Sequence, residues 1–235
     1  MLPQEAGLWD RDDLVENSIV VQGEGDGSFD QSDYVLFYAQ GPHDWYLHPT
    51  LSRYVHRFNV YSDTSFYFIT WGNGNGKRVS TLPSEPASTS VQTSTRKYAF
   101  HETDGYNSLS SGRVWLGENF DFTTDRTFSF GMPNAVPGSN VKITTRVGAR
   151  SNAGSSFSIR ENGNQLTSIS VPNINTAIYG SYYYRANYQT INYSASSVND
   201  GSLDLQYIYS KPLTSSVGYL DFIEMEYLSQ LNPGG

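Results

Sequence analysis

Short runs of alternating apolar and polar residues recur along the whole chain and constrain its fold more than any other feature. In residues 140–147, Val141 and Ile143 fall on one face, whereas Lys142 and Arg146 fall on the other. An alternation of period two is typical of a strand with one buried side and one solvent-facing side. The chain is therefore expected to be all-β.

Turn-forming residues separate these runs, as in Glu161-Asn162-Gly163-Asn164 and Asn199-Asp200-Gly201. Asn-Gly and Asp-Gly adopt positive φ at little cost, so Asn162-Gly163 predicts a β-hairpin. Strands spaced about 8 to 12 residues apart with such turns favour an antiparallel β-sandwich, and we expect a jelly-roll-like one. The predicted strands are 18–21, 34–38, 54–60, 66–71, 97–101, 113–116, 126–130, 140–147, 156–160, 165–171, 182–193, 202–209 and 219–227.

A stretch rich in Pro, Ser and Thr interrupts the pattern between Ser80 and Ser94. It has too few large apolar side chains to bury a core of its own. We expect residues 81–94 to form a linker. It divides a smaller β unit, residues 1–80, from a β-sandwich, residues 95–232.

Composition excludes several classes of function. A net charge of −8 argues against binding a nucleic-acid backbone, which needs clustered Lys and Arg. The chain has no Cys, so it holds no thiolate nucleophile and no disulfide. No stretch approaches the roughly 20 apolar residues of a transmembrane segment, and the first residues do not form a signal peptide. We expect a piece of a longer protein.

Four carboxylates, Glu24, Asp26, Asp30 and Asp33, lie within ten residues and are interleaved with glycines. Such a segment can fold back so that several oxygens converge, as hard cations require. These residues are a candidate calcium site, although the spacing does not match an EF-hand loop. The alternative is a solvated turn ahead of a strand.

The aromatic residues allow a sugar-binding platform. Trp45 with Tyr46, or the run Tyr182–Tyr184, could stack on pyranose rings. Aromatic side chains also fill sheet cores and interfaces. Trp115 and Phe120 are expected to anchor the core of the sandwich.

The last strand carries three acidic residues, Asp221, Glu224 and Glu226. Paired carboxylates can hydrolyse a glycosidic bond. On a regular strand, however, Glu224 and Glu226 share one face and Asp221 lies on the other. The favoured interpretation is solvent-facing polar positions.

Several segments, in the same order and over most of the chain, carry a family resemblance. The matching segments are Gly23–Asp30, Ser32–Pro42, Trp45, Asn59–Asp63, Phe66–Thr70, Gly76–Val79, Ser111–Phe120 and Gly218–Glu224. With these segments the chain resembles the region that precedes the protease domain in PorU-like type IX secretion sortases, which belong to the gingipain-like cysteine peptidases of Bacteroidetes.

The resemblance implies a cell-surface peptidase that removes C-terminal sorting signals from secreted cargo and helps transfer the cargo to surface lipopolysaccharide. Its Cys and His would lie on an α/β domain that follows the matched region. This chain has no Cys, and the resemblance assigns no catalytic role to His43, His48, His56 or His101. We therefore expect a non-catalytic accessory region.

The partners implied are the downstream peptidase domain of the same polypeptide and type IX cargo or attachment-complex proteins. The expected location is the extracellular face of the outer membrane, or the secreted fraction. The alternative is a secreted carbohydrate-binding β-sandwich module.

Overall fold

The computed structural model describes residues 14–59, 62–72, 74–84, 86, 90–107, 114–175, 185–194 (backbone only) and 201–231. The chain forms two compact units, Met1–Thr89 and Ser90–Gly235. The described residues are all-β, and every named strand pair is antiparallel, which confirms the predicted class. The single helical element among them is the 3₁₀ turn Glu24–Asp26.

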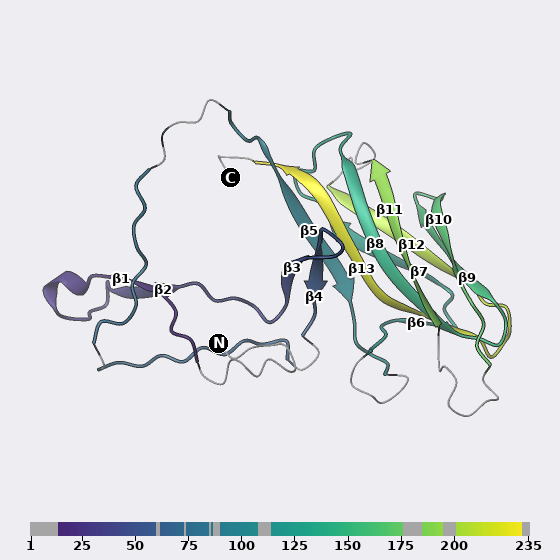
Figure 1. Ribbon diagram of the computed structural model, residues 1–235, viewed down its shortest axis with the longest axis horizontal. Helices are drawn as coiled ribbons and strands as arrows, with labels where there is room; N and C mark the ends of the chain where they lie inside the picture. Colours follow the sequence, from purple (N-terminus) through teal and green to yellow (C-terminus); the bar gives the residue numbers. More distant parts are fainter. Residues whose placement is uncertain are drawn as a thin grey trace. The chain divides into compact units, whose positions relative to one another are not determined.

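Two hairpins make up the regular structure described in the first unit (Figure 1). Strand β1 (Ile19–Gln22) pairs with β2 (Tyr34–Phe37). Strand β3 (Asp44–His48) pairs with β4 (Arg53–Arg57). Two-stranded hairpins are marginally stable at best in water, so each depends on further packing.

The second unit is a sandwich of two sheets. Its strands are β5 (Ser94–Glu102), β6 (Asn119–Phe120), β7 (Asp125–Gly131), β8 (Asn140–Arg150), β9 (Ser155–Glu161), β10 (Asn164–Val171), β11 (Arg185–Ser194), β12 (Ser202–Ser210) and β13 (Val217–Gln230). One sheet has the order β10-β9-β12-β7, and the other has the order β11-β8-β13-β5, with β6 also paired to β13. The chain crosses repeatedly between the sheets in the order of a jelly roll, as the strand pattern predicted.

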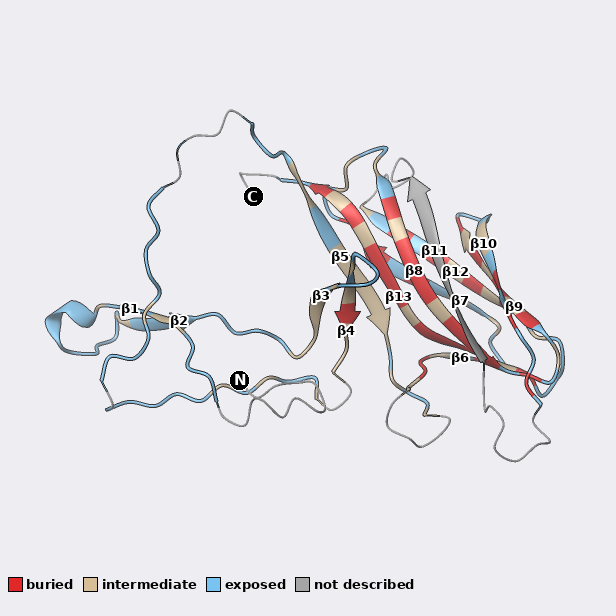
Figure 2. Cartoon of the chain, in the orientation of Figure 1, coloured by how far each residue is buried: buried red, intermediate tan, exposed pale blue. Residues whose placement is uncertain are grey.

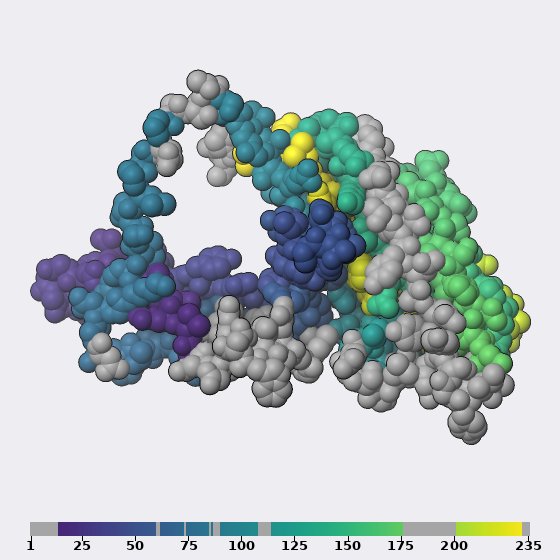
Figure 3. All heavy atoms as spheres, viewed as in Figure 1, coloured from purple at the N-terminus to yellow at the C-terminus, as the bar shows by residue number. Residues whose placement is uncertain are grey.

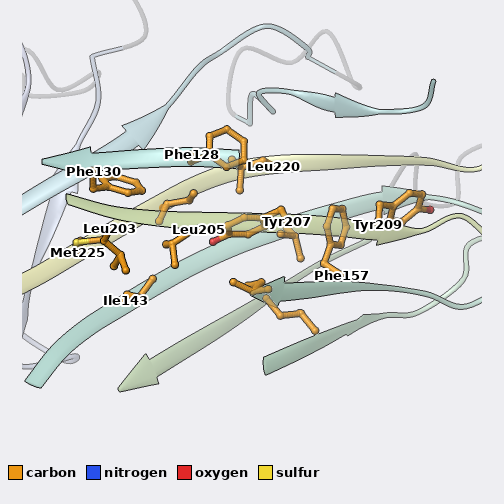
Figure 4. Packing of buried hydrophobic residues seen from close by; sticks show 14 of the residues in the cluster. Phe128, Phe130, Ile143, Phe157, Leu203, Leu205, Tyr207, Tyr209, Leu220 and Met225 are labelled. Carbon is orange, nitrogen blue, oxygen red and sulfur yellow. The ribbon is translucent and has the colours of Figure 1, made fainter. Parts of the chain in front are cut away.

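The core lies between these two sheets (Figures 2 and 4). Cross-strand neighbours such as Leu205 and Phe128, or Tyr209 and Phe157, both face inward. The rings of Phe120 and Phe157 meet edge to face, with centroids 5.2 Å apart. Complete burial of a large apolar side chain contributes about 1.5–3 kcal/mol, so this layer holds the sandwich together.

The predicted Asn162-Gly163 hairpin is confirmed. The two residues connect β9 to β10, and their φ angles of 47° and 78° are both positive. Two positive φ angles in a two-residue loop match the right-handed twist of the flanking strands. Glycine at the second position meets this requirement without strain.

Four local predictions were wrong. Residues 66–71 belong to no described strand, because strand-forming side chains give a strand only where a partner backbone is present. Of the predicted strand 113–116, the described residues 114–116 form only an isolated bridge between Leu116 and Tyr106. Strand β3 was not predicted, because its sequence does not alternate. Trp115 is half-buried and lies outside the core cluster, whereas its neighbour Leu116 is fully buried and Phe120 is in the core as expected.

The described part of the first unit has almost no interior of its own. His56 is its one buried residue, and every buried hydrophobic side chain of the described chain lies at Leu116 or beyond. Figure 2 shows this contrast between the two units. The first unit therefore exposes side chains that a domain normally buries.

Candidate functional site

The acidic loop between β1 and β2 is held in shape by hydrogen bonds from its own backbone amides to its carboxylates. Asp30 Oδ1 accepts hydrogen bonds from the Ser32 amide (2.8 Å) and the Ser32 hydroxyl (2.7 Å). Asp33 Oδ2 accepts one from the Asp30 amide (2.9 Å), and Asp26 Oδ1 accepts one from the Ser28 amide (2.9 Å). The hydrogen bonds from Ser32 lower the pKa of Asp30 below its usual value. Asp26 and Asp30 stay exposed, Asp33 is half-buried, and the three carboxylates fix the path of the turn.

Glu24, unlike the other three carboxylates, pairs with an arginine outside the loop. Its Oε2 lies 2.7 Å from Arg78 Nη2, and this hydrogen bond lowers the pKa of Glu24. Within the described ranges, no group of three or more His, Asp or Glu side chains is arranged to hold a metal ion. Calcium binding by this turn stays a prediction.

Trp45 and Tyr46 are adjacent on β3, so their side chains leave opposite faces of the hairpin. The Trp45 ring lies 5.8 Å from the ring of His56 on β4. The guanidinium carbon of Arg57 lies 5.3 Å from the centre of the Tyr46 ring, and the same guanidinium forms a 2.6 Å ion pair with Asp44. The two aromatic rings therefore do not make one joint platform. Tyr182–Tyr184 lie outside the described residues.

A β-bulge in β13 changes the predicted placement of Asp221. Leu220 pairs with Val147 and Phe222 with Arg146, so Asp221 is the extra residue. Asp221 Oδ2 lies 2.7 Å from Arg146 Nη1. Since a bulge shifts the alternation by one residue, Asp221 joins the face of Arg146, away from the core.

The three acidic residues of β13 thus lie on one face of the sheet, contrary to the predicted alternation. Asp221 and Glu224 are buried, and the expectation of solvent-facing positions was wrong for both. Glu226 instead forms an ion pair with the exposed Arg96 of β5. The Asp221–Arg146 and Glu226–Arg96 pairs each join an acid to an arginine on a neighbouring strand, and such pairing is typical of a structural role.

A His–carboxylate pair joins the end of β5 to the segment before β6. His101 Nε2 lies 2.7 Å from Glu118 Oε1, and the His101 ring packs on Phe128 at 4.8 Å. Burial raises the pKa of Glu118, but hydrogen bonds from His101, from its own backbone and from Thr103 outweigh this, so the pKa lies below its usual value. Sequence reasoning missed the pair, because nothing in the spacing of residues 101 and 118 signals it.

The chain has no Cys, so a catalytic cysteine is absent from it. Among the described residues the buried Ser151 and Ser216 hydroxyls bond to each other at 2.8 Å, not to a histidine. Within the described residues, no helix has the length and hydrophobicity of a membrane-spanning helix.

Comparison with known proteins gives a structural match over nearly the whole chain. No protein-family model and no curated protein matches the sequence. The crystal structure of dimeric latent PorU from Porphyromonas gingivalis superimposes with a TM-score of 0.67 at 20% identity, and it covers 98% of this chain but 21% of that one. The chain thus spans about a fifth of that protein.

Two carbohydrate-binding modules match more weakly. The CBM36-1 domain of a multidomain xylanase from the hindgut metagenome of Trinervitermes trinervoides covers 56% of this chain, with a TM-score of 0.32 at 9% identity and 96% coverage of the module. A CBM36 in complex with calcium and xylotriose covers 57%, with a TM-score of 0.30 at 14% identity and 99% coverage of the module. Scores this low carry no functional argument. The chain shares its fold with a region of PorU.

Proposed function

We propose that this chain is a non-catalytic accessory region of a cell-surface, type IX secretion sortase of the PorU kind. The observation that carries the proposal is the extent of the match, which includes 98% of this chain and therefore both of its compact units. A likeness between β-sandwiches alone would not include the first unit. The ordered sequence segments that resemble the same family support the proposal independently.

The chemistry of the chain fits an accessory role. A cysteine peptidase needs a thiolate, and the sequence contains no Cys. Catalysis would thus belong to a peptidase domain elsewhere in the same polypeptide. The role left for this chain is to pack against that domain or to position the cargo that carries a C-terminal sorting signal.

The exposed apolar side chains of the first unit favour the first of these roles, packing against the peptidase domain. The described residues of this unit expose large apolar side chains, among them Phe66, Phe68 and Trp71 at 71%, 75% and 87%. Exposed apolar side chains gathered in one unit are typical of surfaces that another protein layer covers. The peptidase domain is the layer that the proposal assigns to them.

The test is a processing assay on the longer polypeptide, with and without residues 1–235, using a substrate that bears a type IX sorting signal. The proposal predicts loss of processing while the peptidase domain stays folded. A gene that does not continue into a Cys/His peptidase domain would overturn it.

The carbohydrate-binding alternative has a separate readout. It predicts that the isolated chain binds xylo-oligosaccharides or another glycan, and that calcium strengthens the binding. Glycan binding together with unchanged processing would replace the accessory role with an independent binding role.

A further inference from the structure

Strand β2 has one paired edge and one open edge. The amide of Ile19 donates to Lys77 O (2.9 Å), and the amide of Val79 donates to Ile19 O (3.0 Å). The backbone groups of Ile19 therefore point away from β2, toward residues 77–79. The direction of these two groups determines which residue pairs of β1 and β2 are hydrogen-bonded.

The alternation of an antiparallel ladder then assigns every backbone group of β2. Since Ile19 faces Phe37 as a non-hydrogen-bonded pair, Val20 and Leu36 form the next, hydrogen-bonded pair. By the same alternation, Tyr34 bonds to β1, whereas the N–H and C=O groups of Val35 and Phe37 point outward. No described strand pairs with them.

The side chains along this edge are apolar and accessible. Tyr34, Val35, Leu36 and Phe37 are between 38% and 55% exposed, so neither face of β2 is covered. The purple surface in Figure 3 contains this hairpin. Among the described residues, Tyr67 lies beside β2: its ring is 5.4 Å from that of Phe37, and its hydroxyl donates to Gln40 O at 2.7 Å.

The charge beside the edge is acidic. The β1–β2 hairpin carries four carboxylates, all in the loop that enters β2, and it contains no Lys or Arg. Arg78 pairs with Glu24, which leaves Asp26, Asp30 and Asp33 in the loop that enters β2, and Asp33 directly precedes the first residue of the strand. A second copy of this chain would bring the same acidic loop to the contact, so electrostatics favour a basic partner.

We propose that the open edge of β2 is a strand-addition surface for an extended, apolar segment of another polypeptide that carries Lys or Arg. The partner would exchange backbone hydrogen bonds with Val35 and Phe37, place alternate apolar side chains on the exposed faces, and set its basic residues beside the acidic loop. The inference stands on the geometry of the hairpin and holds with or without the accessory role above.

The test uses the whole chain and two labelled peptides of alternating Val and Thr, one flanked by lysines and the other by glutamates. Fluorescence anisotropy should show binding of the lysine peptide that weakens as salt is added. Equal binding of the glutamate peptide, or no binding of the lysine peptide, would overturn the proposal.

The variant Val35→Pro tests the open edge of β2 without removing a hydrogen bond between β1 and β2. Proline removes the outward N–H of Val35 but no bond to β1, and proline is tolerated on an edge strand. Affinity for the lysine peptide should fall about tenfold, the equivalent of roughly one hydrogen bond. The matched control Val35→Thr keeps the N–H and should bind like the wild type.

Two further measurements exclude trivial explanations. An Hα–Hα nuclear Overhauser contact between Ile19 and Phe37 in Val35→Pro shows that the hairpin is intact, and unchanged affinity in that variant contradicts the proposal. If sedimentation equilibrium shows a dimer that Val35→Pro dissociates, a second copy of this chain occupies the edge. That result would overturn the proposal of a basic partner.

Discussion

The carboxylate of Asp33 occupies the space in which a side chain of residue 23 would stand. An ideal Cβ on Gly23 would lie 1.6 Å from Asp33 Oδ1, and the φ angle of Gly23 is +94°. The turn therefore needs glycine at this position, both for its backbone and for the close approach of Asp33.

Gly23→Ala should disrupt the acidic turn. Alanine adds about 1–2 kcal/mol of backbone strain and displaces Asp33 from the Asp30 amide. Loss of the cross-strand nuclear Overhauser contacts between β1 and β2 is the expected readout. Gly25→Ala is the matched control, because nothing lies within 4 Å of its Cβ position, and it should leave those contacts in place.

Asp221→Ala should destabilise the sandwich by about 3 kcal/mol, because it removes a buried carboxylate that pairs with the Arg146 guanidinium. Urea denaturation measures the effect. Glu226→Ala removes a pair with the exposed Arg96 and should cost about 1 kcal/mol or less. Equal losses in the two variants would contradict the account of the bulge.

Phe120 and Phe122 are two residues apart and should behave oppositely. Phe120 is fully buried and Phe122 is 98% exposed. Phe120→Ala should cost about 3–5 kcal/mol in the free energy of unfolding. Phe122→Ala should change it by less than about 0.5 kcal/mol, and a large loss there would show that the loop packs differently.

Glu118 should make the stability of the sandwich sensitive to acid. Its pKa in the folded chain lies below the usual 4.5, so the folded state favours the charged form. The stabilisation is fully present above pH 4.5 and is lost as the pH falls through the folded-state pKa. Unfolding free energies measured from neutral to acid pH should fall more steeply for the wild type than for Glu118→Gln. Parallel curves would refute this role.

Local pattern was sufficient to predict the sandwich, because strands such as β12 alternate between buried and more exposed side chains. Leu203, Leu205 and Tyr207 alternate in the sequence and are all buried in the structure. The bulge at Asp221 and the pairing of His101 with Glu118 could not be predicted, since both depend on which strands become neighbours. The alternation rule assumes regular strand pairing, and one inserted residue reverses which side chains beyond it face the core.

The first unit was harder to predict for a different reason. Residues 66–71 have the composition of a strand, but a strand forms only where another backbone supplies hydrogen bonds. The four carboxylates of the acidic turn lie within ten residues of one another in the sequence. Their hydrogen bonds to Ser28, Asp30 and Ser32 amides and the pairing with Arg78 appear only in three dimensions.

The central claim is that the first unit packs against a peptidase domain of the same polypeptide. Hydrogen–deuterium exchange on the isolated chain and on the longer polypeptide tests it most directly. We expect fast exchange in residues 66–72 of the isolated chain and marked protection of the same residues in the longer polypeptide, with β8 and β13 protected in each. Equal protection of residues 66–72 in the two samples would contradict the claim.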